Sequence, residues 1–177
     1  HFNITRTPFY YYDKTLLSNT LAKLIRLAGE RNYHIHYAVK ANANPEILKL
    51  IAASGIGADC VSGGEIKAAL EAGFPAKKIV FAGVGKADWE IEYALEKKIF
   101  CFNVESAEEL SVIEELAKKK ENIASIALRI NPNIDAHTHE YITTGLSENK
   151  FGIPIEMLDS IFSQIQRSPQ IGRASCR

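Results

Sequence analysis

Short apolar segments alternate with longer amphipathic segments along most of the chain. The apolar segments have the length of strands and are rich in aliphatic and aromatic residues. They are His34–Lys40, Ala58–Val61, Ile79–Ala82, Ile99–Val104 and Ile126–Ile130. Because each interval between them has room for one helix, the pattern predicts βαβ units, and hence a parallel sheet with right-handed crossovers.

The intervals carry the signals of helices. Apolar residues repeat at helical spacing in Lys14–Ala28 and in Pro45–Ala53. Proline at the first position of the second helix is typical of a helix start. Capping boxes, which satisfy free backbone N–H groups, are predicted at two further starts, and glycines stand at two predicted ends. These signals are Ser62 with Glu65, Ser106 with Glu109, and Gly55 and Gly73.

A parallel sheet either stays open or closes into a barrel. An open Rossmann-type sheet should have a glycine-rich turn after its first strand, and the turn Ala41–Pro45 contains no glycine. The sequence therefore favours an α/β fold of the (β/α)8 TIM-barrel type. Since a whole barrel takes about 250 residues, we expect this chain to supply a partial barrel.

Composition and charge describe an ordinary globular protein. The 177 residues include 21 basic and 21 acidic side chains, and 46% are hydrophobic. No apolar run reaches the ~18 residues of a membrane-spanning helix, and a zero net charge favours no nucleic-acid partner. Three scattered cysteines and the lack of a signal peptide indicate a reducing compartment. We expect a cytoplasmic protein that binds neither membranes nor nucleic acids.

The last residues depart from the pattern. Residues 171–177 have no apolar periodicity, and one allowed coding of them resembles a sequencing-adapter read-through. We expect residues 170–177 to be an artefactual tail, with a frayed polar C-terminus as the alternative. A fresh read of the source DNA beyond Gln170 would decide between the two.

Polar residues follow each predicted strand, and the ends of parallel barrel strands share the face that carries active sites. Lys40 ends the first strand after an apolar run, where burial would lower its pKa and suit a nucleophile toward an aldehyde. The alternative is a lysine that reaches solvent or pairs with Asp59. Asp59 interrupts the second strand and needs a partner, for which Lys40 is the natural choice.

The other candidates have structural explanations as well. Glu65 could form a carboxylate pair with Asp59, although the capping box already accounts for it. Arg129 interrupts the fifth strand, where it could bind an anionic group or a planar ring, or form an internal salt bridge. The sequence His137-Thr-His139-Glu140 lacks the further ligands that zinc requires, so we predict no metal site.

Seven segments in order resemble a known family. Tyr37–Asn42 (YAVKAN) resembles the lysine motif of the alanine-racemase-like, fold-type III enzymes, which use pyridoxal 5′-phosphate (PLP). The whole set resembles the diaminopimelate decarboxylases more closely than the ornithine or arginine decarboxylases. The other six segments are Ala58–Glu65, Ile79–Lys86, Phe102–Ser106, Leu128–Pro132, His139–Gly145 and Lys150–Ile153.

This resemblance implies roles for the candidate residues. Lys40 would form the Schiff base with PLP, Asp59 and Glu65 would lie in the acidic neighbourhood of the cofactor, and Arg129 would orient groups beside its ring. The barrel would be of the alanine racemase-like, PLP-binding type, and a β-domain would include a strand from Phe9–Tyr12. The expected units are residues 1–12 for that strand, 13–169 for the partial barrel, and 170–177 for the tail.

The resemblance also implies an activity, namely decarboxylation of the amino acid meso-2,6-diaminopimelate to L-lysine and CO2 by a homodimer. The family's ring-stacking histidine, phosphate-binding glycines and substrate-binding arginine would belong to a later part of a longer chain. We therefore expect the 177 residues alone to be inactive. Two alternatives remain: a sister decarboxylase for ornithine, arginine or carboxynorspermidine, and a PLP-binding barrel protein that is not an enzyme.

Overall fold

The structure, a computed structural model, describes residues 6–132 and 151–173 of the chain, which divides into the units 1–35 and 36–177. The first unit contains helix α1 (Lys14–Gly29). Its start is capped by Asp13, whose Oδ1 accepts a hydrogen bond of 3.0 Å from the Leu16 N–H. Residues 6–13 form neither helix nor strand. The strand expected at Phe9–Tyr12, which would pair with another domain, therefore stays a prediction.

The second unit alternates strands with helices. Its strands are β1 (His36–Ala38), β2 (Gly57–Cys60), β3 (Ile79–Phe81), β4 (Cys101–Val104), β5 (Ala124–Leu128), β6 (Ile130–Asn131), β7 (Ile153–Pro154) and β8 (Ile171–Arg173). Its α-helices are α2 (Pro45–Ala53), α3 (Gly63–Glu71), α4 (Asp88–Lys97), α5 (Ala107–Lys119) and α6 (Leu158–Arg167). Short 3-10 turns cover Val39–Ala41, Ala76–Lys78 and Ile155–Met157.

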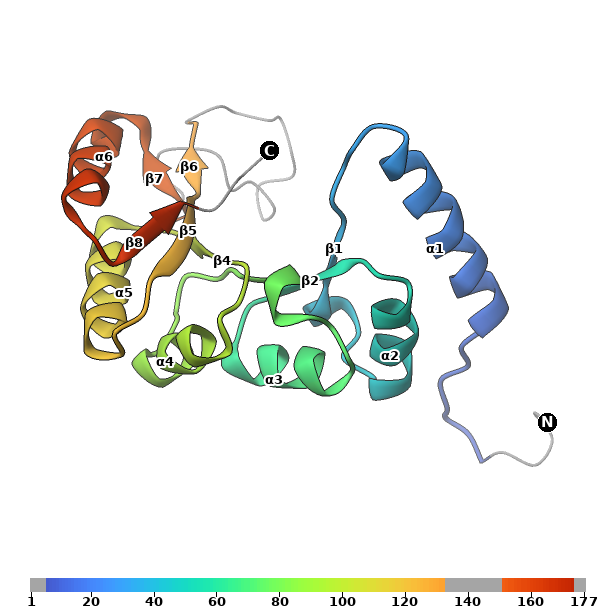
Figure 1. The fold of residues 1–177 in the computed structure, drawn as a ribbon. Helices are drawn as coiled ribbons and strands as arrows, with labels where there is room; N and C mark the ends of the chain where they lie inside the picture. Colours follow the sequence, from blue (N-terminus) through green and yellow to red (C-terminus); the bar gives the residue numbers. More distant parts are fainter. Residues whose placement is uncertain (1–5, 133–150, 174–177) are drawn as a thin grey trace. The chain divides into compact units, whose positions relative to one another are not determined.

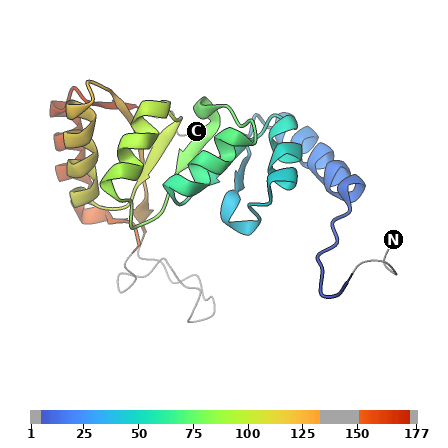
Figure 2. The same cartoon turned by 90° about the horizontal axis from the view of Figure 1, so that it is seen from below.

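Six of these strands form one parallel sheet in the order β1-β2-β3-β4-β5-β8, and β6 pairs with β7 in a separate ladder (Figure 1). Helices α3, α4 and α5 lie side by side against one face of the sheet (Figure 2). Each strand pairs with the next strand of the barrel wall, as βαβ units require. The predicted α/β fold, a partial (β/α)8 barrel, is confirmed.

The hydrophobic core lies between the sheet and its helices. Alternate strand residues such as Cys60, Phe81 and Val104 are fully buried there. The Phe81 and Phe102 rings pack with their centroids 6.0 Å apart. Strand residues next to these buried positions, including Asp59 and Asn103, are only half-buried. Because successive side chains of a strand point to opposite faces, these polar residues belong to the face without helices.

The sequence predicted the type and order of these elements well, although several strand ends differ by a few residues. Helix α2 has the predicted bounds, with Asn44 Oδ1 accepting from the backbone N–H groups of Glu46 and Ile47 at 3.0 and 3.4 Å. Gly55 and Gly73 end α2 and α3 with φ angles of +84° and +99°, a conformation that glycine adopts without strain.

The end of the described chain was not predicted in this form. Helix α6 and strand β8 are absent from the expected elements, and residues of the expected tail form β8, where Ile171 lies opposite Ala124 of β5. Backbone pairing does not reveal whether residues 170–177 are native sequence, so the artefactual tail stays a prediction.

A buried carboxylate fixes the starts of α3 and α4 to each other. Glu90, only 9% exposed, accepts hydrogen bonds from the Gly63 N–H at 2.6 Å and from the Ala87 N–H at 2.9 Å. These backbone groups have no partner within their own helices. One side chain thus caps its own helix and the preceding one, and the loops after β2 and β3 are held together.

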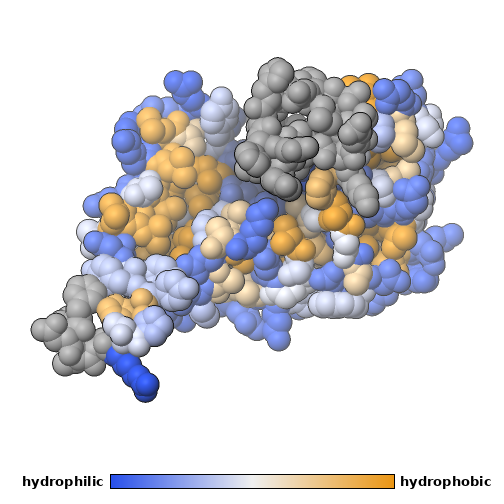
Figure 3. All heavy atoms as spheres, turned by 180° about the vertical axis from the view of Figure 1, so that it is seen from behind, coloured by the Kyte–Doolittle hydropathy of each residue, from blue (hydrophilic) through white to orange (hydrophobic). Residues whose placement is uncertain are grey.

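Some apolar side chains remain exposed in the second unit, among them Val84, Ile130, Ile155 and Phe162. Figure 3 shows apolar patches interspersed with hydrophilic surface on the face opposite to that of Figure 1. Within residues 6–132 and 151–173, no helix combines the length and the apolar character needed to cross a bilayer.

Candidate active site

Lys40 lies in the 3-10 turn Val39–Ala41, directly after β1 rather than within the strand. The turn is closed by the Asn42 N–H, which donates to the Val39 carbonyl at 3.1 Å. The Tyr37 hydroxyl donates to the Asn42 carbonyl, also at 3.1 Å. The Lys40 side chain is exposed. Of the two arrangements expected for Lys40, burial and a side chain that reaches solvent, the structure shows the second, because the chain turns at Val39 before the lysine is reached.

Asp59 lies beside this turn on the neighbouring strand, where it is paired in register with Ala38. Burial raises the pKa of the Asp59 carboxyl, while the charges of Lys40 and His36 act in the opposite direction with less effect. Among the described residues, Asp59 Oδ1 is buried without any hydrogen-bond partner. No ion pair within 4.0 Å joins Lys40 and Asp59 in this part of the chain. The predicted pairing is therefore limited to the electrostatic attraction of the two charges over a longer distance.

A half-buried carboxylate with a free acceptor oxygen thus faces the same strand ends as an exposed primary amine. A buried acceptor without a donor costs free energy. The carboxyl ends of β1 and β2 are therefore suited to a ligand that carries both an N–H or O–H donor for Asp59 and an electrophilic carbon for Lys40.

Glu65 serves as a helix cap. Ser62 Oγ accepts from the Glu65 N–H at 3.2 Å, and Glu65 Oε2 accepts from the Val61 N–H at 2.8 Å. The predicted capping box at the start of α3 is confirmed, with its return bond one residue earlier than in the standard motif. This cap fixes the loop that follows the Asp59 strand.

Arg129 follows β5 and forms an internal salt bridge, one of the two arrangements expected for it. Its Nη1 donates to Glu105 Oε1 at 3.0 Å and to Oε2 at 3.2 Å. The guanidinium also lies over the Phe151 ring, 5.3 Å from its centroid. The strand of Arg129 is four positions from β1 in the sheet, and neighbouring strands are about 4.8 Å apart. Lys40 and Asp59 are therefore neighbours, whereas Arg129 lies at the carboxyl end of a strand farther along the sheet.

A buried lysine follows β3, namely Lys86, for which the sequence pattern predicted no role. Its side chain is 1% exposed. The ammonium donates to Glu109 Oε1 at 2.6 Å, to the Gly83 carbonyl at 2.7 Å and to the Asn103 carbonyl at 2.9 Å. Three donors thus meet three acceptors. Lys86 is a structural cation, and the only sequence signal for its partner was the capping box that contains Glu109.

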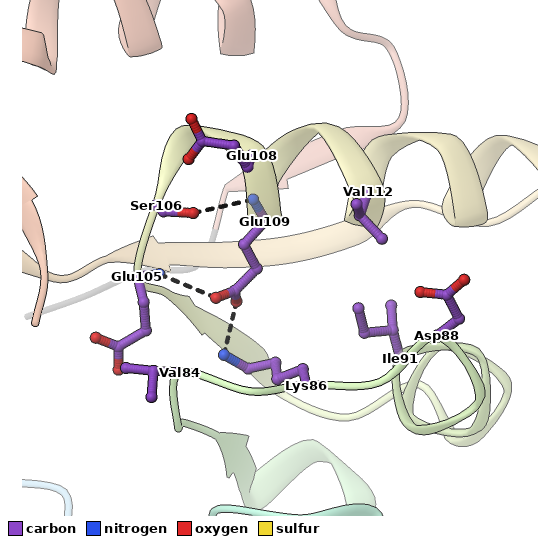
Figure 4. A pocket seen from close by; sticks show the side chains of 9 residues that line it. All are labelled: Val84, Lys86, Asp88, Ile91, Glu105, Ser106, Glu108, Glu109 and Val112. Carbon is purple, nitrogen blue, oxygen red and sulfur yellow. Dashed lines mark hydrogen bonds and ion pairs between the residues drawn. The ribbon is translucent and has the colours of Figure 1, made fainter. Parts of the chain in front are cut away.

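A pocket of about 300 Å³ opens between the β3–α4 loop and the start of α5 (Figure 4). Lys86, Glu105 and Glu109 contribute to its wall. Glu109 Oε2 accepts from the Glu105 N–H at 3.4 Å, so the ion pair is linked to the residue that binds Arg129. Burial raises the pKa of Glu109, against the opposing effect of Lys86.

The described residues contain no group of three or more histidine, cysteine, aspartate or glutamate side chains that could hold a metal ion. The segment His137–Glu140 lies outside these residues. Cys60 and Cys101 are buried cysteines that form no disulfide within the described residues, and burial raises the pKa of Cys60 to about 12. A thiol with such a pKa is a poor nucleophile, so Cys60 is not suited to nucleophilic attack, whereas the exposed Lys40 amine is accessible.

The chain is similar to known decarboxylases over most of its length. It is 61% identical over 161 residues to a diaminopimelate decarboxylase of Bacteroides thetaiotaomicron, covering 90% of this chain and 42% of that protein. A diaminopimelate decarboxylase of Helicobacter pylori strain J99 is 51% identical over 152 residues, covering 86% of this chain and 38% of the relative. The chain thus spans about two fifths of the length of these relatives.

Solved structures agree with the sequence relatives. A crystal structure of Helicobacter pylori diaminopimelate decarboxylase complexed with L-lysine matches with a TM-score of 0.86 and 45% identity, covering 97% of this chain and 44% of that one. The family model described as "Pyridoxal-dependent decarboxylase, pyridoxal binding domain" matches residues 18–171. The chain therefore belongs to the family of pyridoxal-dependent decarboxylases, and residues 18–171 match its pyridoxal binding domain.

Proposed function

We propose that the complete protein containing this chain decarboxylates meso-2,6-diaminopimelate to L-lysine and CO2 with PLP as its cofactor. The substrate is supported by the relatives at 61% and 51% identity, which are diaminopimelate decarboxylases, and by the similar Helicobacter pylori structure, which contains L-lysine. The observation that carries the proposal is the exposed Lys40 amine next to the buried, unpartnered oxygen of Asp59.

The residues at this edge fit a pyridoxal group. Pyridoxal has an aldehyde that a primary amine can attack, and Lys40 is accessible at the carboxyl end of β1. It also has polar ring substituents, one of which could donate the hydrogen bond that Asp59 Oδ1 lacks within the described residues. We infer that Lys40 holds the cofactor covalently and that Asp59 and Arg129 contact it.

Each chain residue has a defined task in this proposal. When bound, PLP supplies an electron sink for the electrons left by the departing CO2. Lys40 Nζ would hold the cofactor, and its amine could also carry a proton near the reacting carbon. Asp59 presents an acceptor oxygen on the adjacent strand. Glu65 contributes from the border of the cofactor site, by fixing the loop after β2.

The assembly and location of the complete protein are part of the same proposal. We infer a homodimer in the cytoplasm, because the resemblance on which the substrate rests implies a dimeric enzyme. The two buried cysteines of the described residues form no disulfide with each other, which fits a reducing compartment.

The test uses the complete protein incubated with PLP, reduced with borohydride and digested. We expect the pyridoxyl group on the peptide that contains Lys40. Lys40→Arg should abolish this label and the release of CO2, whereas Lys49→Arg, at an exposed lysine on α2 that pairs with Glu46, should retain both. A label on any other lysine would refute the assignment.

The substrate is tested with the same preparation. CO2 release from meso-diaminopimelate should exceed that from ornithine, arginine and carboxynorspermidine. A preference for one of the other amines would replace the proposed substrate while leaving the role of Lys40 intact. A Lys40 label without any CO2 release would favour the non-enzymatic, PLP-binding alternative.

A further inference from the structure

Glu105 is a charged residue at the carboxyl ends of the strands for which the proposed reaction has no role. It directly follows β4 and is 6% exposed. A buried carboxylate requires a compensating partner, and the partner here is Arg129, which contacts both carboxylate oxygens. We propose that Glu105 is a positioning residue, which holds the Arg129 guanidinium in the orientation that PLP binding requires. This inference rests on the proposed contact between Arg129 and the cofactor.

Arg129 needs such a partner because its side chain is 42% exposed. A long side chain at an exposed strand end samples many rotamers, and ordering it costs conformational entropy. Only Nη1 binds Glu105. Within residues 6–132 and 151–173, no hydrogen bond uses Arg129 Nε or Nη2, so the other edge of the guanidinium can donate to a ligand. One carboxylate thus orients the group without occupying all its donors.

The second contact of Arg129 restricts it further. The Phe151 ring lies against the guanidinium, and its place is fixed by the backbone that follows. The Ile153 N–H donates to the Arg129 carbonyl at 2.7 Å. Gly152 has a φ of +83°, and a Cβ there would lie 3.1 Å from the Arg129 carbonyl oxygen. This close approach brings Phe151 to the arginine, so that ring and carboxylate together define one guanidinium position.

Glu105 is itself held from its backbone. Its N–H donates to Glu109 Oε2 at 3.4 Å, and Glu109 forms the buried ion pair with Lys86 (Figure 4). A series of contacts therefore runs from Lys86 in the β3–α4 loop through Glu109 and Glu105 to Arg129 at the end of β5, with one cation at each end. The rigid end of this series is the buried pair, and its accessible end is Arg129.

The experiment is a double-mutant cycle in the complete apoenzyme, with PLP as the ligand and its dissociation constant as the measured quantity. Glu105→Gln keeps the shape of the side chain and removes its charge, and Arg129→Gln removes the guanidinium. We expect each single variant to bind PLP about tenfold more weakly, because each substitution weakens or removes one charge-assisted hydrogen bond to the cofactor. The double variant should bind no more weakly than Arg129→Gln alone, because Glu105 acts only through Arg129.

A second measurement separates positioning from a general loss of structure. In the apoenzyme, the 15N signals of the two terminal nitrogens of Arg129 should be resolved when Nη1 is held by a carboxylate, and should average in Glu105→Gln. The matched control is Glu108→Gln, an exposed carboxylate three residues away on the same pocket wall, which should change neither the spectrum nor the dissociation constant.

The outcomes distinguish this inference from the proposed function. If Arg129→Gln leaves PLP binding unchanged, the proposed contact between Arg129 and the cofactor is wrong. If Arg129→Gln weakens binding but Glu105→Gln does not, or if the two effects add in the double variant, the positioning role of Glu105 is wrong while the cofactor site stands. Unaltered Arg129 signals in Glu105→Gln would also overturn the inference.

Discussion

Lys86 and Glu109 form a buried ion pair that joins the β3–α4 loop to the first turn of α5, with 2.6 Å between Nζ and Oε1. Their side chains are 1% and 12% exposed. The Lys86 ammonium also lies 5.4 Å from the centroid of the Phe81 ring, directly above the core. The pair is hydrogen-bonded to the backbone of Glu105 and therefore supports the residue that binds Arg129.

Breaking this pair from one side should destabilise the chain strongly. Lys86→Met leaves the Glu109 carboxylate buried without its counter-ion, and we expect a loss of about 3–5 kcal/mol in the free energy of unfolding. Urea denaturation measures this loss. The double variant Lys86→Met, Glu109→Leu should recover much of it, because the uncompensated charge is gone. A single variant as stable as the unmodified chain would show that the pair is not buried in solution.

The stability of the chain should depend on the ionisation of Asp59. Burial raises the pKa of Asp59 above its ordinary value of 3.8, so the folded state binds the proton more tightly than the unfolded state. Its contribution to stability is then fully present below pH 3.8 and is lost as the pH rises through the raised pKa. Asp59→Asn cannot ionise, and its free energy of unfolding should increase relative to the unmodified chain as the pH rises above 3.8 and through the raised pKa.

Urea denaturation at several pH values tests this prediction. The matched control is Asp88→Asn, an exposed aspartate at the start of α4, which corrects for the loss of one negative charge. A stability difference between Asp59→Asn and the unmodified chain that is the same at every pH would contradict the prediction. A gain in stability from Asp59→Asn at pH 7 would indicate that Asp59 is kept for binding rather than for folding.

Two glycines should respond in opposite ways to the same substitution. A Cβ on Gly57 would lie 2.5 Å from the Lys78 carbonyl oxygen and would also clash with the His36 ring. Backbone cannot move aside easily, so Gly57→Ala should destabilise the chain by about 1–3 kcal/mol. A Cβ on Gly64 in α3 would meet only Ser62 Oγ, at 3.7 Å, and Gly64→Ala should stabilise the helix by up to about 1 kcal/mol.

Thermal unfolding of the two variants checks this difference. The Gly57 effect reports on the site as well, because the His36 ring that covers Gly57 also contributes to the electrostatics of Asp59. Equal melting temperatures for the two variants would show that β1 and β2 are less closely packed than the register His36 opposite Gly57 implies.

Most of the secondary structure could be predicted from the sequence, because its signals are local. The caps at Asn44, Ser62 and Ser106 satisfy backbone groups two or three residues away, and the apolar period reports which face of a helix is buried. The position of Lys40 at the end of the first strand follows from the same local pattern. The resemblance of the ordered motifs predicted the family.

The environment of each charged side chain could not be predicted in this way. The sequence left open whether Lys40 is buried or reaches solvent and gave Lys86 no role, whereas the structure exposes Lys40 and buries the Lys86 side chain. The partners of Lys86 and Arg129 are 23 and 24 residues away along the chain. Which charges meet depends on the register of neighbouring strands and on the packing of helices against the sheet. The sequence by itself therefore determined the elements and their order as far as β5, and only the tertiary structure decided which lysine is accessible, because burial arises from contacts between distant segments.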